Sequence, residues 1–270
     1  MPFRTGWSVL CLCWLAVLAP AATADALDEG EADPQPVIAL IIDDLGNRLG
    51  AGRQVVSLPG PVACAFLPRG PYTRELARRA HADHKEVMLH LPMQALATET
   101  QAAEQDELTL DMTFTQLRSA LARDIAAVPF VSGLNNHQGS LLTRHPGSMA
   151  WLMQAIGEHG NLFFVDSRTT SATVARRVAQ EYGIPNSERN VFLDNEAELD
   201  AVRAKFRELV STARREGTAL GIGHPHPATL EVLLQELGRL DAHGVQLVPV
   251  AQLIERQSNR QLAWHASSSR

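Results

Sequence analysis

The sequence is poor in cysteine, in aromatic residues and in basic charge. Three cysteines among 270 residues exclude a small scaffold held together by disulfides. The 24 Lys and Arg against 30 Asp and Glu exclude the basic face of a general nucleic-acid-binding protein. With 45% hydrophobic and 20% charged residues, the chain is too apolar to be intrinsically disordered. These limits leave a globular protein of one large or two small domains.

Residues 1–24 have the pattern of a signal peptide. Arg4 supplies the positive start, residues 7–18 form an uncharged apolar run, and Ala22 and Ala24 form a small-x-small cleavage site. We expect cleavage after Ala24 and export to the periplasm or the extracellular space. The alternative is an uncleaved membrane anchor, but the run is shorter than the roughly 20 residues that a spanning helix needs. We therefore expect no retained transmembrane helix.

The expected mature chain divides into three parts. Residues 25–36 are acidic and contain proline, which indicates a disordered linker. Residues 37–256 form the expected globular domain, and the polar residues 257–270 form an expected flexible tail. Loss of the signal peptide leaves Cys64 as the one remaining cysteine. An exported chain without disulfides must depend on its apolar core for stability.

Short apolar runs alternate with amphipathic segments along the whole domain. Strands that alternate with helices form βαβ units and a mostly parallel sheet. We predict a single α/β domain with a closed or nearly closed barrel, and a doubly wound open sheet is the alternative. The predicted strands are 37–42, 62–67, 86–91, 130–134, 162–165, 191–193, 219–222 and 245–250, and the predicted helices are 71–82, 113–128, 148–159, 171–182, 199–216 and 228–243.

Polar residues gather where the predicted strands end. Each has an ordinary structural explanation on its own, such as a helix cap, a turn or a satisfied core histidine. In a parallel α/β protein, however, the carboxyl ends of the strands meet at one rim, which is where ligands bind. Among these residues, Asp194 is the most typical of a helix cap. In chain order the residues are Asp43, Asp44, His90, Asn136, His137, Ser140, Asp166, Arg168, Asp194 and His224.

Two aspartates and two or three histidines at one rim indicate a metal site beside a carboxylate base. One carboxylate with two neutral histidines suits Zn²⁺ with an open position for water. A second carboxylate can accept a proton, and a further histidine can protonate a leaving group. These groups together serve the hydrolysis of an amide or an ester. The sequence has no Gly-x-Ser-x-Gly, His-Glu-x-x-His or glycine-rich phosphate-binding motif, which excludes those classes of site.

Six motifs in order resemble those of the divergent polysaccharide deacetylase family. They extend over residues 36–254, which is nearly the whole expected domain. The family is similar to the NodB-type carbohydrate esterases, so the resemblance implies a distorted (β/α)7 barrel, in agreement with the alternating pattern. The motifs are IIDDLG at 41–46, HLPM at 90–93, GLNNHQGS at 133–140, FVDSRTT at 164–170, FLDN at 192–195 and GIGHP at 221–225.

The resemblance also implies roles for single residues. Asp43 resembles the general base of the deacetylase Asp-Asp pair, and Asp44 resembles its metal-binding carboxylate. His90 resembles the first metal-binding histidine. His224 resembles the histidine that protonates the leaving amine. The expected cofactor is a divalent metal ion, with zinc favoured by the donor set.

The chain departs from ordinary deacetylases in its third ligand. Those enzymes carry a second metal-binding histidine a few residues after the first, and residues 91–94 contain none. We predict that His137 supplies this ligand instead. Asp166 is the alternative candidate for this ligand. Otherwise we expect Asp166 and Arg168 to orient the metal ligands or the base without contacting the metal themselves. As substrate contacts we expect two other polar residues of the fourth-strand motif, Asn136 and Ser140.

The leading hypothesis is an exported, metal-dependent hydrolase that removes acetyl groups from an envelope or extracellular polysaccharide, such as peptidoglycan or another N-acetylated glycan. The alternative is a catalytically inactive deacetylase fold that binds a glycan or an envelope protein, since aromatic residues are only 5% of the chain. A glycosidase with Asp43 and Asp166 as paired carboxylates would leave the histidines without a role. The acidic net charge favours a substrate that is neutral or locally cationic at the cleft.

Overall fold

The computed structural model describes residues 1–3, 35–97 and 107–268 of the chain. Gln35–Arg270 form one compact unit, to which every element below belongs. The predicted signal peptide with its cleavage site, and most of the predicted linker, lie outside the described residues. Among the described helices, none combines the length and the apolar character that crossing a membrane requires.

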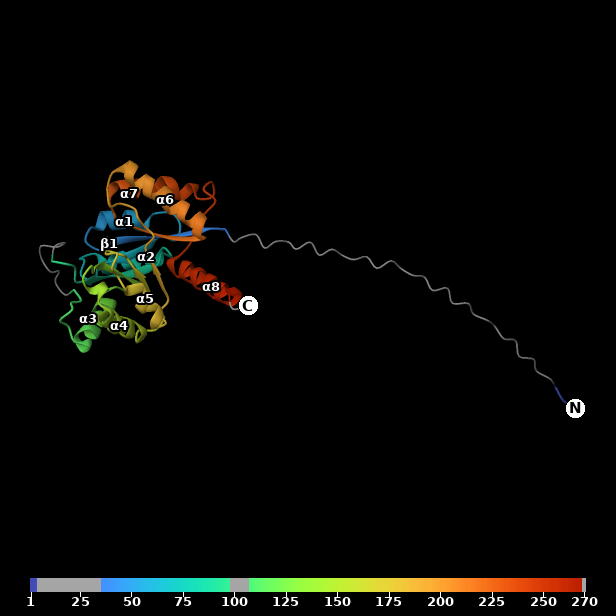
Figure 1. The fold of residues 1–270 in the computed structure, drawn as a ribbon. Helices are drawn as coiled ribbons and strands as arrows, with labels where there is room; N and C mark the ends of the chain where they lie inside the picture. Colours follow the sequence, from blue (N-terminus) through green and yellow to red (C-terminus); the bar gives the residue numbers. More distant parts are fainter. Residues whose placement is uncertain (4–34, 98–106, 269–270) are drawn as a thin grey trace. The chain divides into compact units, whose positions relative to one another are not determined.

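A curled sheet of parallel strands forms the centre of the domain (Figure 1). The strand order is β6-β5-β4-β3-β2-β1-β8-β7, and the short β9 pairs with β1. The sheet is therefore an open barrel with β6 and β7 as its edges, and the predicted single α/β domain of barrel type is confirmed. The strands are β1 (Val37–Leu45), β2 (Ala63–Phe66), β3 (Val87–Met93), β4 (Val131–Gln138), β5 (Phe163–Asp166), β6 (Asn186–Glu188), β7 (Val191–Phe192), β8 (Thr218–Gly223) and β9 (Gln246–Leu247).

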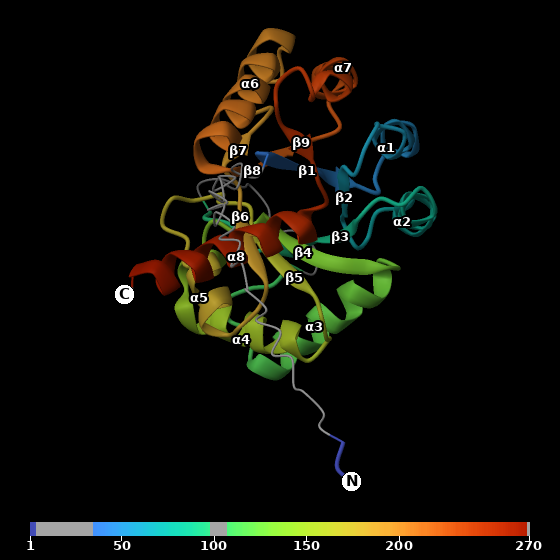
Figure 2. The same cartoon turned by 90° about the vertical axis from the view of Figure 1, so that its right-hand side faces the viewer.

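All the helices except the last pack on the outside of the curled sheet (Figure 2). Most of them connect one parallel strand to the next, as βαβ units require. The helices are α1 (Leu49–Val56), α2 (Thr73–Ala82), α3 (Phe114–Ala127), α4 (Pro146–Gly157), α5 (Ala175–Glu181), α6 (Leu199–Glu216), α7 (Pro227–Glu236) and α8 (Val250–Ser268), with 3-10 turns at Leu142–Arg144 and Leu237–Arg239.

Apolar side chains along each strand alternate between two layers. On β1, Val37, Ala39 and Ile41 face the interior of the barrel, and the residues between them pack outward under the helices. The alternation follows from the pleat of a strand, in which successive side chains point to opposite faces. A polar residue that follows an inward apolar residue by two positions is therefore placed at the top of the barrel interior.

The structure contains two helices, α1 and α8, that the apolar pattern did not indicate, and α1 is the less expected from its composition. Its segment LGAGRQVV has two glycines, each of which costs a helix interior about 1 kcal/mol relative to alanine. Tertiary packing compensates for this cost. Val55 and Val56 are buried, and α1 approaches α2 so closely that a Cβ on Gly52 would lie 2.3 Å from Leu76 Cδ1. The glycine allows this approach, which the sequence pattern alone does not indicate.

The C-terminal part of the domain differs from our prediction. The strand expected at 245–250 is reduced to β9, Gln246–Leu247, and α8 begins directly afterwards. The helix continues to Ser268, so it includes most of the tail that we expected to be flexible from residue 257. Leu253 and Ile254 of α8 pack on the inner apolar layer of the barrel, which explains why this segment folds as a helix against the sheet.

Gln257 of α8 joins the two sides of the open barrel. Its Oε1 accepts a hydrogen bond from Ser187 Oγ on β6 at 3.0 Å. Its Nε2 donates to Thr218 Oγ1 on β8 at 3.2 Å. Because β6 is an edge of the sheet and β8 lies beside the opposite edge, this side chain bridges the gap that strand pairing leaves open.

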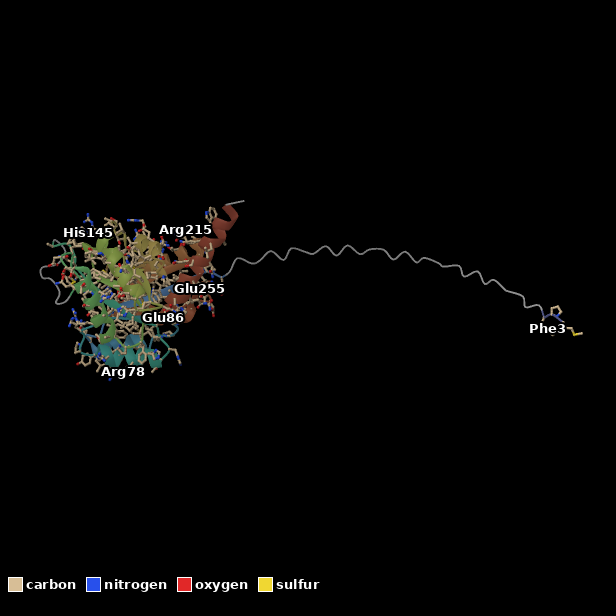
Figure 3. The ribbon with its side chains drawn as sticks, turned by 90° about the horizontal axis from the view of Figure 1, so that it is seen from below. Phe3, Arg78, Glu86, His145, Arg215 and Glu255 are labelled. Atoms are coloured by element: carbon tan, nitrogen blue, oxygen red, sulfur yellow. The ribbon has the colours of Figure 1, made fainter. Side chains whose placement is uncertain are left out.

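The first turn of α8 is held by the side chain of Glu86, the residue directly before β3. Both carboxylate oxygens of Glu86 accept hydrogen bonds, from the backbone N–H groups of Val250 and Ala251. Figure 3 shows Glu86 beside the part of α8 on which Glu255 is labelled. A carboxylate in this position satisfies two unpaired N–H groups and complements the positive end of the helix dipole.

Glu86→Ala is expected to destabilise the domain by about 1–3 kcal/mol, because two partly buried, charge-assisted hydrogen bonds and a helix cap are lost. Urea denaturation followed by circular dichroism measures this change. Glu75→Ala is the matched control, since it removes an exposed ion pair with Arg53 that is worth less than about 1 kcal/mol. Equal losses of stability in the two variants would contradict the role of Glu86 as a cap.

Candidate metal centre and catalytic site

The polar ends of several strands meet at the top of the barrel interior. Four of these side chains continue the inward series of their strands, two residues beyond an apolar member of the inner layer. Asp44 and His137 do not follow such an apolar residue, but the structure brings together all five of the predicted catalytic and metal-binding residues. The inward pairs are Ile41 and Asp43 on β1, Met88 and His90 on β3, Val165 and Ser167 at β5, and Ile222 and His224 at β8.

Asp44 reaches the same space by a local distortion of β1. Consecutive side chains of a regular strand point to opposite faces, so Asp43 and Asp44 could not both face the interior. The pairing of β1 with β2 shifts register between Ile42 and Leu45, and Asp44 has a φ of +57°. A bulge and a left-handed residue at the end of a strand re-aim a side chain, and strained backbone of this kind occurs at functional sites.

Asp44, His90 and His137 form a triangle of potential ligand atoms. Asp44 Oδ1 lies 3.3 Å from His90 Nε2 and 3.1 Å from His137 Nδ1. The two histidine nitrogens are 3.0 Å apart. Tetrahedral zinc with bonds of about 2.0–2.1 Å separates its ligand atoms by about 3.3 Å, which is close to these distances.

The donor set of this triangle fits a divalent metal ion. Asp44 Oδ1 is buried, and no described group donates a hydrogen bond to it, so the oxygen has an open lone pair. Burial disfavours the charged carboxylate, but the neighbouring His137 and His90 outweigh burial and lower the pKa of Asp44 below its usual range. An ionised carboxylate and two imidazole nitrogens are the ligands that Zn²⁺ takes in mixed N/O sites.

Asn135 fixes the orientation of both the base and the first histidine. Its Nδ2 donates to Asp43 Oδ1 at 2.8 Å and to Ser167 Oγ at 3.2 Å. Its Oδ1 lies 3.0 Å from His90 Nδ1, which must therefore carry the proton. His90 Nε2 then has a free lone pair toward the ligand triangle. This arrangement is the usual one for a metal-binding histidine, whose other nitrogen donates to a fixed acceptor.

Asp43 lies beside the ligand triangle but outside it. Its Oδ2 is 3.6 Å from His90 Nε2, and the residue is only 3% exposed. Burial raises the pKa of Asp43, and the positive potential of His90 and His224 partly opposes that increase. A carboxylate whose pKa is raised toward neutral pH is better suited to accept a proton from water than an ordinary aspartate.

His224 forms a hydrogen-bonded pair with Asp194. His224 Nδ1 lies 3.0 Å from Asp194 Oδ1, and the backbone N–H of His224 donates to Oδ2 at 2.6 Å. Burial lowers the pKa of His224, but Asp194 and the nearby Asp43 outweigh burial and raise it. The Nε2 atom of His224 faces Asp44 Oδ2 at 3.8 Å. The raised pKa favours the protonated form of His224 beside the ligand triangle, and a protonated histidine is what a general acid requires.

Our interpretation of Asp194 as a helix cap was wrong. Asp194 follows Phe192 of β7 by two positions, so it continues the inward series of its strand. That spacing was a signal available in the sequence. His226 completes a second group of donor atoms with Asp194 and His224. Because Asp194 already accepts from His224 and from Thr229 Oγ1 at 2.7 Å, we assign this group to proton transfer rather than to metal binding.

The structure also corrects the predicted substrate contacts. Asn136 is buried on the opposite face of β4 from Asn135, where its Oδ1 accepts from Ser167 N at 2.8 Å. Ser140 is buried in the following turn, where its Oγ accepts from Leu96 N at 3.0 Å. Both side chains hold loops together, so we no longer propose them as substrate contacts. The residue that the prediction missed is Asn135, which shares its face with His137 two positions later.

Asp166 and Arg168 also lie outside the ligand group. Asp166 points away from the barrel interior and accepts hydrogen bonds from Arg168 N and Thr173 Oγ1, each at 2.8 Å. Burial raises the pKa of Asp166. The Arg168 guanidinium forms an ion pair with Glu188 at 3.4 Å. Both residues stabilise the loop after β5, so Asp166 is not retained as the alternative candidate for the third ligand.

A cleft opens from the ligand triangle between α1 and the loop that leads from β8 into α7; these two helices are neighbours in Figure 2. Its volume is about 210 Å³. Asp44 and His224 line its inner end, and Arg48 and His226 line its rim. A second hollow of about 430 Å³ continues along the same helices, with Arg48 shared by both. The cleft gives a small group from outside access to Asp44 and His224.

Comparison with known proteins identifies the family. The family model described as divergent polysaccharide deacetylase matches residues 40–254. The chain belongs to this family. The family resemblance inferred from the six motifs is therefore confirmed over nearly the whole domain.

Two relatives in the divergent polysaccharide deacetylase family are similar along much of the chain. The protein YibQ of Escherichia coli K12 is 39% identical over 198 residues, which are 73% of this chain and 61% of YibQ. A protein of Haemophilus influenzae is 34% identical over 219 residues, which are 81% of this chain and 77% of that protein. The chain thus matches less than two thirds of the length of YibQ.

Solved structures agree on the fold. Protein ATU2773 from Agrobacterium tumefaciens C58 superposes with a TM-score of 0.77 at 20% identity, covering 81% of this chain and 89% of that one. The peptidoglycan deacetylase PdaC from Bacillus subtilis superposes with a TM-score of 0.53 at 12% identity, covering 87% of this chain and 98% of that one. Both similarities show the shared deacetylase-type fold.

Proposed function

We propose that the protein is an exported, metal-dependent hydrolase that removes acetyl groups from an envelope polysaccharide. The observation that carries the proposal is the ligand triangle of Asp44, His90 and His137, with its buried and unbonded Asp44 Oδ1. Membership of the divergent polysaccharide deacetylase family supports the substrate class. The fold shared with a peptidoglycan deacetylase supports an N-acetylated glycan in the cell wall.

The residues of the site divide the chemistry between them. Asp44, His90 and His137 would hold Zn²⁺, which lowers the pKa of a bound water toward 7 and polarises a carbonyl group. Asp43 accepts the proton of the attacking water, and Asn135 keeps its carboxylate in place. His224, with Asp194 behind it, donates a proton to the leaving amine or alcohol. The raised pKa of both proton-transfer residues suits a reaction near neutral pH.

The signal-peptide pattern of residues 1–24 supports export. Peptidoglycan and matrix polysaccharides lie outside the cytoplasm, so an exported hydrolase meets them directly. Western blotting of periplasmic and cytoplasmic fractions, together with N-terminal sequencing, tests this part of the proposal. Cleavage after Ala24 in the periplasmic fraction is expected, and an uncleaved chain confined to the cytoplasm would contradict it.

Metal content and acetate release test the activity. We expect the purified protein to contain about one zinc ion per chain by mass spectrometry and to release acetate from peptidoglycan or chitooligosaccharides. Dialysis against a chelator should abolish acetate release, and added Zn²⁺ should restore it. Absence of zinc after supplementation, together with absence of acetate, would contradict the proposed function.

One observation favours a second candidate, a deacetylase fold that binds a glycan or an envelope protein without catalysis. Asp43, the proposed base, is almost completely buried and has both oxygens directed toward neighbouring side chains. Such a carboxylate has little room for the attacking water. Stoichiometric zinc without acetate release from any acetylated glycan would support this candidate over the enzyme.

A further inference from the structure

The rim of the cleft combines two loops that the sheet topology places side by side. β1 pairs with β8 in parallel, so the loop after β1 and the loop after β8 both leave the sheet at the carboxyl ends of its strands, side by side. The first loop contributes Arg48 to the cleft, and the second contributes His226. The catalytic end of the same cleft is formed by Asp44 and His224. A substrate whose acetyl group lies at the inner end of the cleft can therefore reach the rim with a neighbouring group.

Arg48 has no partner within the chain, as far as residues 35–97 and 107–268 describe it. Its side chain is exposed, and no ion pair or hydrogen bond of its guanidinium occurs among those residues. Arg53, on the same short helix, shows the usual arrangement, with its guanidinium 2.9 Å from Glu75 Oε1. Asp44 is the one carboxylate among the residues that line the cleft, and it faces the two histidines of the metal centre.

The backbone that carries Arg48 is held firmly in place. The carbonyl oxygens of Leu45 and Gly46 accept hydrogen bonds from Leu67 N and Tyr72 N, each at 2.9 Å. Gly46 has a φ of +116°, and a Cβ at this position would lie 2.1 Å from Thr73 Oγ1, so the loop fits tightly against α2. A guanidinium on a fixed loop loses less conformational entropy on binding than one on a mobile loop.

We propose that Arg48 binds a carboxylate on the substrate, so that the enzyme prefers acetylated sugars that carry an acidic group, such as muramic acid or an acetylated uronic acid. Guanidinium binds carboxylate through two parallel hydrogen bonds, which makes arginine selective for this group. The inference rests on the proposed deacetylase function and names the substrate class of the same site. It revises our expectation of a neutral or locally cationic substrate. That expectation used the acidic net charge, which affects a substrate at long range and is screened by salt. Arg48 would instead contact the substrate directly in the cleft.

A pair of matched substrates tests the proposal. Peptide-free peptidoglycan strands expose the lactyl carboxylate of muramic acid, and amidation of that carboxylate removes its charge without changing the acetyl groups. For the acidic strands, Arg48→Ala is expected to lower kcat/KM by about 10- to 100-fold, mainly through KM. For the amidated strands the expected loss is less than about threefold. Arg48→Lys should recover part of the preference, and Arg53→Ala should match the unmodified enzyme on both substrates.

The outcomes separate this inference from the proposed function. Equal rates on acidic and amidated strands in the unmodified enzyme, or equal losses on both in Arg48→Ala, would overturn the role of Arg48 while leaving deacetylation intact. If neither substrate releases acetate, the proposed function fails. In that case, isothermal titration calorimetry measures the binding of the acidic and the amidated strands and shows whether Arg48 recognises the carboxylate. Weaker binding of the acidic strands alone in Arg48→Ala supports the inference, and unchanged binding overturns it.

Discussion

Asp44→Ala is expected to lower the zinc content of the protein from about one ion per chain to less than about 0.1, because the triangle loses its only charged ligand. Acetate release should fall by at least about 10³-fold, since the metal contributes several kcal/mol of transition-state stabilisation. Both quantities come from one preparation, by metal analysis and by an acetate assay. The result would place the metal at the carboxyl end of β1.

Two further variants make the Asp44 experiment specific. Asp200→Ala removes a carboxylate that is 99% exposed at the start of α6, and it should retain zinc and activity. Asp166→Ala should also retain zinc, because its carboxylate is used within the loop after β5. Full zinc content in Asp44→Ala together with loss of zinc in Asp166→Ala would show that the ligand set is wrong. Thermal unfolding of each variant confirms that a loss of zinc is not a loss of fold.

Asp194→Asn is expected to lower kcat by about 10²-fold and to change the pH dependence of the reaction. The acid form of His224 is the protonated one, and the pKa of His224 is raised chiefly by its hydrogen bond with Asp194. The intact enzyme therefore loses activity as the pH rises through this raised pKa. Removal of the charge on Asp194 lowers the pKa of His224, so the same loss should begin at a lower pH.

The pH profile of kcat between pH 5 and about 9 measures this shift. Thr229→Val is the matched control, because it removes a hydrogen bond to Asp194 Oδ2 but leaves the charge and the contact with His224. Its descending limb should stay close to that of the unmodified enzyme. An Asp194→Asn variant with reduced activity but an unchanged profile would show that Asp194 merely supports the fold.

Much of the site could be predicted because parallel strands impose a simple rule. Apolar runs locate buried strands, and their carboxyl ends converge whatever the details of packing. This is why Asp43, His90 and His224 were found from the sequence and also lie together in the structure. The proposal of His137 as third ligand came from the lack at residues 91–94 of the second histidine that ordinary deacetylases carry, and from its place after the fourth predicted strand; the structure places it beside Asp44.

The errors have a common physical cause in the alternation of side chains along a strand. Asn135 and Asp194 face the site, whereas Asn136 and Asp166 face away from it, although all four lie at strand ends. The face of a residue depends on register, and a shift of one position reverses it. Counting two residues onward assigns Asp194, which follows the inward Phe192, and Asp166, which follows the outward Phe164.

The remaining features depended on contacts between distant parts of the chain. The register shift at the end of β1 and the left-handed Asp44 bring two consecutive carboxylates into one space, which a regular strand forbids. The gap between β6 and the opposite sheet edge is filled by α8, whose polar residues meet partners on both sides. Arg48 enters the cleft because β1 lies beside β8.

Composition and periodicity alone predicted the parallel α/β sheet, its long buried strands and the rim where the polar residues gather, because apolar runs and their spacing can be seen in the local sequence. The short edge strand β6 was not predicted. The choice of which rim residues bind metal, which transfer protons and which merely hold loops belongs to the assembled barrel. That choice depends on register, on a bulge and on neighbouring strands, and these are settled by packing across the whole domain.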